Sequence, residues 1–209
     1  MNVQKGYLLV VEDIPDILDL MEATLKFKGY RVITARNGQE ALEVIQKERP
    51  ALIISDILMP KMDGFSLLHR LRINPETRDI PLVFLTATYV APEDKAFAIS
   101  IGATRFIEKP LNLEEFILII TELLTQGVHT PYEPLKELDF YEGYRHRLRT
   151  KLEQKITQIA RIERLLESVA EEEKLSFTDS LLLAVNEREE IRQLLEQIHE
   201  HMSTITNSE

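Results

Sequence analysis

The chain has 209 residues, of which 44% are hydrophobic and 29% charged, within the ordinary range for a globular protein of one or two domains. The sequence contains no cysteine, which excludes disulfides, thiolate metal sites and cysteine nucleophiles. Its net charge of −10 argues against a nucleic-acid backbone as the main partner, since such binding depends on lysine and arginine. No apolar run approaches the roughly 20 residues of a membrane span, and no signal-peptide core opens the chain, so we expect a cytoplasmic protein without membrane contact.

Strand-like and helix-like segments alternate through the N-terminal part of the chain. Apolar runs of strand length occupy residues 6–11, 30–34, 51–56, 81–86 and 104–107. Segments with helical periodicity follow them at residues 17–29, 38–49, 64–73, 92–101 and 113–124. Five such units in succession predict an α/β domain whose parallel sheet is covered by helices on both faces.

Polar residues stand where the predicted strands end. Glu12 and Asp13 follow the first run, Asp56 ends the third, Thr86 ends the fourth, and Lys109 follows the fifth. Because the carboxyl ends of parallel strands share one edge of a sheet, we expect these side chains to meet there. Three carboxylates would repel one another unless a cation lay among them, and an all-oxygen set suits Mg²⁺ better than zinc. With a lysine and a hydroxyl beside them, the arrangement predicts phosphoryl transfer to a carboxylate, with Asp56 as the nucleophile.

These residues lie in four short motifs whose identities and separations resemble those of one family. The motifs are Glu12-Asp13, residues 56–64 (DILMPKMDG), Thr86-Ala87 and residues 106–110 (FIEKP). Over roughly residues 5–125, the sequence is similar to the receiver domains of two-component response regulators. The resemblance implies a flavodoxin-like, doubly wound fold in which five parallel strands follow the order 2-1-3-4-5.

The resemblance also implies a phosphoacceptor and a metal site. Asp56 would accept phosphate from the phosphohistidine of a sensor histidine kinase or a phosphotransfer protein. Glu12, Asp13 and Asp56, with the backbone carbonyl of Leu58, would hold Mg²⁺, and Lys109 would pair with the phosphoryl group. The chain would then catalyse its own phosphoryl transfer and dephosphorylation and would not be an enzyme in any other sense.

Two further roles follow from the resemblance. Thr86 would turn inward to bind a phosphoryl oxygen, and Phe106 occupies the position of an aromatic switch that moves from exposed to buried as Thr86 moves. Leu58 and Thr88 occupy positions that, in the family, help to place an attacking water. Because Leu58 cannot hydrogen-bond a water and Thr88 does so only weakly, we expect slow self-dephosphorylation.

The composition changes after residue 125. Residues 126–134 contain one glycine and two prolines, which predicts a linker between a receiver domain at 1–125 and a separate region at 135–209. In that region apolar residues recur at helical spacing, and possible capping residues at 174–179 suggest a break between two helices. The apolar stripe of the first helix consists of Leu148, Leu152, Ile156, Ile159, Ile162 and Leu166. The stripe of the second consists of Leu181, Ala184, Arg188, Ile191, Leu195, Ile198, Met202 and Ile205.

The second stripe advances in alternating steps of three and four residues, which is the spacing of a coiled-coil seam. We therefore expect an all-α helical hairpin. Two helices alone bury little surface, so the seam is expected to meet a second copy, giving a homodimer, or the receiver. In either case the hairpin would be the output of the receiver, through self-association or by binding a protein partner.

Two other outputs are compatible with the sequence. The first is DNA binding by an unrecognised helical module, for which the hairpin is a poor candidate because residues 129–209 carry 11 Lys or Arg against 17 Asp or Glu. The second is a phosphorelay through His146, because residues 146–152 (HRLRTKL) resemble the phosphoacceptor box of histidine kinase hairpins. Arg147 stands where that box has an acid and Lys151 where it has proline, which argues against transfer at His146.

Overall fold

The computed structural model describes residues 6–86, 92–110, 112–126, 135–168 and 171–206. The chain divides into two compact units, Met1–Leu135 and Lys136–Glu209. Of the predicted linker, only Gln126 is described, and it ends a helix; residues 127–134 lie outside the described ranges. Within those ranges, no helix is both long enough and apolar enough to cross a bilayer.

The first unit contains one sheet of five parallel strands. These are β1 (Leu8–Val11), β2 (Val32–Ala35), β3 (Leu52–Ser55), β4 (Leu82–Thr86) and β5 (Arg105–Glu108). Their order is β2-β1-β3-β4-β5, as the sequence predicts. Every residue of β1, β3 and β4 is buried, in agreement with their continuous apolar sequences, whereas the edge strand β5 exposes part of its length.

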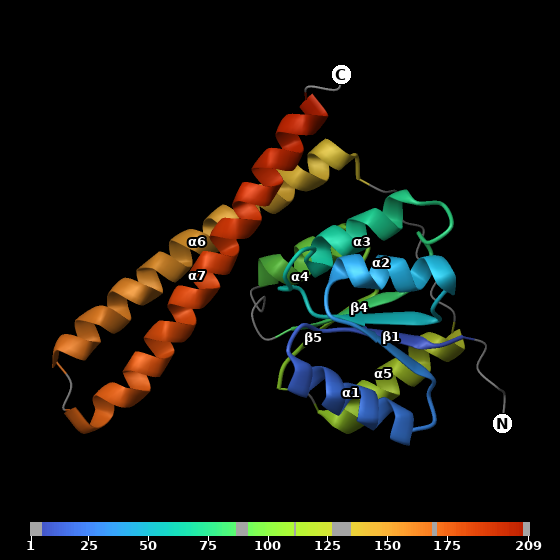
Figure 1. Cartoon of the computed structure of the whole chain (residues 1–209), viewed down its shortest axis with the longest axis horizontal. Coiled ribbons are helices and arrows are strands. Elements are labelled where there is room, and N and C mark those ends of the chain that lie inside the picture. The colour runs from blue at the N-terminus through green and yellow to red at the C-terminus, as the bar shows by residue number, and fades with distance from the viewer. Residues whose placement is uncertain (1–5, 87–91, 111, 127–134, 169–170, 207–209) are drawn as a thin grey trace. The chain divides into compact units, whose positions relative to one another are not determined.

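Helices cover both faces of this sheet. They are α1 (Pro15–Phe27), α2 (Gly38–Lys47), α3 (Gly64–Ile73), α4 (Pro92–Ser100) and α5 (Leu113–Gln126). Figure 1 shows α1 and α5 on one face and α2, α3 and α4 on the other. The predicted doubly wound α/β fold is therefore confirmed.

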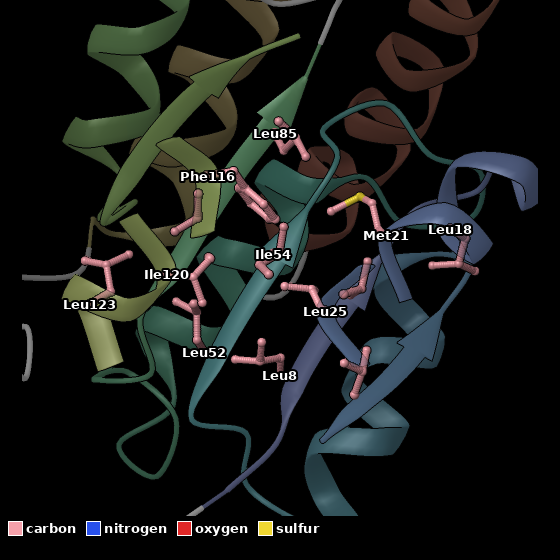
Figure 2. Packing of buried hydrophobic residues seen from close by; sticks show 13 residues of the cluster. Leu8, Leu18, Met21, Leu25, Leu52, Ile54, Leu85, Phe116, Ile120 and Leu123 are labelled. Atoms are coloured by element: carbon pink, nitrogen blue, oxygen red, sulfur yellow. The ribbon is translucent and has the colours of Figure 1, made fainter. Parts of the chain in front are cut away.

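The core beneath α1 and α5 fixes how the strands lie beside one another. It combines alternate residues of the central strands with residues of each helix that recur every three or four positions (Figure 2). The strands contribute Leu8, Val10, Val32, Leu52, Ile54, Val83 and Leu85, and the helices contribute Leu18, Met21, Leu25, Phe116, Ile120 and Leu123. In this register Val11 lies opposite Ser55, so β1 and β3 end at the same edge of the sheet.

The start of α3 closes the loop that follows β3. Asp63 caps the helix, since its carboxylate accepts hydrogen bonds from the Ser66 amide at 3.0 Å and the Ser66 hydroxyl at 2.6 Å. At Gly64 a Cβ atom would lie 2.3 Å from the Asp56 carbonyl oxygen and 2.9 Å from Cε1 of Phe84. Only glycine allows the helix to begin this close to the end of β3.

The second unit is a pair of antiparallel helices, α6 (Glu137–Ser168) and α7 (Glu171–Thr206), which lie side by side (Figure 1). Two side-chain contacts join them. The Lys155 ammonium lies 2.5 Å from the Glu187 carboxylate, and His201 Nε2 lies 2.9 Å from Glu137 Oε1. The predicted all-α region at the C-terminal end is therefore confirmed.

The predicted break at residues 174–179 is wrong, because these residues are helical and belong to α7. The capping residues that suggested the break are accommodated within the helix. The Thr178 hydroxyl, for example, donates to the Lys174 carbonyl at 2.8 Å, one turn back along α7. The connection between the helices falls at residues 169–170, which lie outside the described part of the chain.

Replacing Gly64 with alanine should destabilise the first unit by about 1–3 kcal/mol, because the new methyl group meets backbone that is held by β3. Gly29→Ala is the matched control: its Cβ meets no atom within 4 Å, and only the left-handed backbone at φ +89° opposes it. That strain is worth roughly 1–2 kcal/mol. Urea unfolding of both variants measures the difference, and a smaller loss for Gly64→Ala than for Gly29→Ala would contradict this interpretation.

Candidate functional site

The ends of β1 and β3 place two carboxylates beside each other. The Glu12 amide donates to the Ala35 carbonyl at 3.1 Å, and the Asp56 amide donates to the Val11 carbonyl at 2.9 Å. Both bonds extend the pairing of parallel strands by one residue. The backbone of Glu12 and Asp56 is therefore held by the sheet and not by a free loop.

One carboxylate oxygen from each of Glu12, Asp13 and Asp56 lies within 4.8 Å of the others. Glu12 is 1% exposed, whereas Asp13 and Asp56 are partly buried and remain open to solvent on one side. The sequence predicts this convergence. Three carboxylate oxygens with an open side fit Mg²⁺, which prefers oxygen ligands and retains several waters.

Lys109 joins this group from the end of β5. Its Nζ lies 2.8 Å from Glu12 Oε2 and 3.7 Å from Asp56 Oδ2. Its backbone amide donates to the Thr86 carbonyl at 2.9 Å, which ties the residue to the end of β4. The ammonium group is therefore hydrogen-bonded to Glu12 and lies within reach of the proposed phosphoacceptor.

The two oxygens of Asp56 have different surroundings. Oδ1 accepts a hydrogen bond from the Ile57 amide at 2.7 Å, and Oδ2 is the oxygen nearer to Lys109. Neither the bond from the Ile57 amide nor the bond from Lys109 to Glu12 is predicted by the sequence. Every residue has a backbone amide, and the second bond joins strands that are not neighbours, so neither leaves a local pattern in the sequence.

Burial makes it unfavourable for Glu12, Asp13 and Asp56 all to carry a charge. It raises the pKa of Glu12 above its usual value, aided by the nearby charge of Asp56 and opposed by the hydrogen bond from Lys109. Burial also raises the pKa of Asp13, and the nearby charge of Asp56 raises it further. A folded chain at neutral pH therefore contains carboxylates that a bound cation would stabilise.

The remaining predicted residues occupy the expected elements. Thr86 ends β4 and is fully buried, and Phe106 lies in β5 with 8% of its surface exposed. Leu58 is partly buried in the loop after β3, and the role of its carbonyl stays a prediction. Thr88 lies outside the described residues. His146 is exposed on α6, in the second unit.

Comparison with known proteins agrees with this geometry. The family model described as the response regulator receiver domain matches residues 8–121. The response regulator SaeR of Staphylococcus aureus is 30% identical over 136 residues, which are 65% of this chain and 58% of SaeR. The chain thus spans 58% of the length of the curated relatives it matches.

Two solved structures illustrate the likeness of the fold. The signal receiver domain of a signal transduction histidine kinase from Syntrophus aciditrophicus has 35% identity and a TM-score of 0.55, covering 62% of this chain and 98% of that one. The chemotaxis response regulator CheY4 of Vibrio cholerae has 35% identity and a TM-score of 0.53, covering 56% of this chain and 98% of that one.

The sheet order, the acid group and the family match together define the class of the first unit. The chain belongs to the family of response regulator receiver domains. Its N-terminal unit is the receiver of a two-component system, and it is similar to the CheY-like structures above.

Asp13→Asn should stabilise the chain in the absence of divalent cations by on the order of 1 kcal/mol, because it removes a charge that burial desolvates and that Asp56 repels. Because the folded-state pKa of Asp13 is raised, the wild type carries this penalty at neutral pH and loses it as pH falls. The difference between variant and wild type should therefore shrink as pH approaches the ordinary value of 3.8.

Thermal unfolding with and without Mg²⁺ measures this effect, with Asp19→Asn on the exposed face of α1 as the control. The wild type and the control should be stabilised by Mg²⁺, and Asp13→Asn much less so. Equal stabilisation of Asp13→Asn and wild type would remove Asp13 from the metal site.

Proposed function

We propose that this chain is a response regulator that takes a phosphoryl group onto Asp56 from a sensor histidine kinase or a phosphotransfer protein. The observation that carries the proposal is the joint position of three carboxylates and one ammonium group at the ends of β1, β3 and β5.

In the proposed reaction, an Asp56 oxygen attacks the phosphorus of a phosphohistidine. The P–N bond breaks, the imidazole leaves with its electron pair, and an acyl phosphate forms on Asp56. Mg²⁺, held by Glu12, Asp13, Asp56 and the Leu58 carbonyl, would supply positive charge to the oxygens of the transferred group. The chain would act only on itself, in transfer and in dephosphorylation.

Lys109 is the group whose partner would change in this reaction. Its Nζ is hydrogen-bonded to Glu12 and lies 3.7 Å from Asp56 Oδ2. A phosphoryl group on Asp56 adds anionic oxygens within reach of the ammonium, and these would compete with Glu12 for it. Glu12 would then be left to the metal.

Thr86 and Phe106 would transmit the change. They lie on the neighbouring strands β4 and β5, and the Thr86 hydroxyl would turn toward a phosphoryl oxygen. Phe106 is buried in this structure, the arrangement expected when the switch is on. Phosphorylation would then stabilise an arrangement that the chain can already adopt.

The helical hairpin would be the output, acting through self-association or through binding of a protein partner. Apolar side chains that the hairpin leaves exposed support this role, among them Ile156, Leu182 and Leu183, which are 52%, 60% and 61% exposed. The excess of acidic residues in 129–209 favours a protein surface over DNA as the target.

Acetyl phosphate with Mg²⁺ should add one phosphoryl group to the intact chain, detected by mass spectrometry, and Asp56→Ala should abolish the addition. Asp19→Ala, which removes an exposed carboxylate of α1, is the control and should label like the wild type. An unlabelled wild type, or a label that persists in Asp56→Ala, would overturn the proposal.

Leu58→Asn should shorten the lifetime of the phosphorylated chain by roughly tenfold, because the amide can orient a water that leucine cannot. Leu58→Met keeps an apolar side chain and should leave the lifetime unchanged. The decay of the labelled species after removal of acetyl phosphate gives both rates. Equal lifetimes for the asparagine and methionine variants would show that position 58 does not limit hydrolysis.

A further inference from the structure

Arg188 is a charged residue in the apolar seam of α7, between Ala184 and Ile191. It is partly buried, and its Nε atom is fully buried without a hydrogen-bond partner. No hydrogen bond or ion pair joins its side chain to any residue that the structure describes. A buried Nε without a partner is unfavourable, since burial removes water from this atom without replacing its hydrogen bond.

A carboxylate without a partner lies at the same level on the neighbouring helix. The pair Lys155–Glu187 sets the register of this part of the hairpin and places Arg188 within one residue, about 1.5 Å along the axis, of the level of Glu153. Glu153 is exposed, and within the described ranges its carboxylate makes no hydrogen bond or ion pair. The hairpin therefore contains two opposite charges at one level that do not pair with each other.

The apolar cluster beside these charges is incompletely covered. Its buried members are Ile159, Ile162 and Ala184, and around them Leu166, Phe177, Leu181 and Val185 are only partly buried. Ile156, a member of the predicted stripe, is 52% exposed, and Leu182 is 60% exposed. The register places Ile156 within one residue of the level of Val185, so exposed apolar surface continues from one helix to the other.

We propose that a second copy of the chain covers this face and forms a four-helix bundle, in which Glu153 pairs with the partner's Arg188 and Arg188 with the partner's Glu153. Ile156 would then pack against the partner's Val185 and Leu182. This inference rests on the proposed self-association of the hairpin and specifies its surface.

A second copy suits this face because the face is self-complementary. A two-fold axis brings together the same patch of both subunits, so a single arrangement forms two equivalent Glu153–Arg188 pairs across the interface. Glu153 and Arg188 lie at nearly the same level of the hairpin. They can pair between copies only if the two-fold axis runs parallel to the helices, so that the α6 helices of both copies point in the same direction. Pairing also requires α6 to lie against the partner's α7, because contact between the two α6 helices would leave Arg188 unpaired.

Charge reversal in separate chains tests this pairing. In Glu153→Arg both positions are basic, and in Arg188→Glu both are acidic. Each variant alone should have its dimer dissociation constant raised by about a hundredfold or more, because like charges would face each other across the interface. An equimolar mixture should recover the dimer as a heterodimer, since every pair across its interface joins opposite charges.

The mixture distinguishes pairing between copies from pairing within one hairpin, because neither single variant has opposite charges at positions 153 and 188 of its own chain. Light scattering over a concentration series, with and without Mg²⁺ and beryllofluoride, gives the mass, and native mass spectrometry identifies the heterodimer. The double variant E153R/R188E should dimerise like the wild type and shows that both new side chains are tolerated. Arg164→Glu and Glu200→Arg reverse exposed charges elsewhere on the helices and should dimerise normally without preferring each other.

Two results would overturn the inference. If the wild type dimerises but the mixture of single variants stays monomeric while circular dichroism shows intact helices, the pairing is wrong and self-association uses another surface. If the wild type is monomeric at every concentration, with and without beryllofluoride, self-association fails together with this surface. Labelling of Asp56 is independent of both results and reports on the receiver alone.

Discussion

The receiver depends on three carboxylates that are held close together although they repel one another. Oxygens of Glu12, Asp13 and Asp56 lie within 4.8 Å because the buried strands β1 and β3 end at the same edge of the sheet. The apolar core under α1 and α5 holds the strands in that register and so opposes the repulsion. Lys109 offsets part of the charge, and the remainder makes the site receptive to a divalent cation and a phosphoryl group.

Much of this arrangement could be predicted from the sequence because its causes are local. The five apolar runs predict the strands, their alternation with helical segments predicts a parallel sheet, and a parallel sheet brings Asp56 and Lys109 to one edge. The bond from Lys109 to Glu12 could not be predicted, because it depends on the distance between strands that are not adjacent. The prediction of a break at residues 174–179 is wrong because Thr178 can bond to its own helix as well as cap a new one.

The hairpin shows the same limit in its seam. A heptad spacing predicts that α7 has an apolar face and that Arg188 interrupts it. The spacing does not predict that Glu153, at the same level on α6, leaves that charge unpaired. Opposite charges that share a level without pairing are understandable if their partners belong to another molecule. The receiver and the hairpin would then share one property: each contains charged side chains that gain their partners only on binding, a cation in the receiver and a second copy in the hairpin.

The most direct test is a crystal structure of the full chain with Mg²⁺ and beryllofluoride, which mimics the phosphoryl group on Asp56. We expect a metal ion bound by Glu12, Asp13 and Asp56, and a Lys109 Nζ that has left Glu12 for a fluorine on Asp56. A Lys109 still hydrogen-bonded to Glu12, with no metal among the three carboxylates and no fluoride on Asp56, would contradict it.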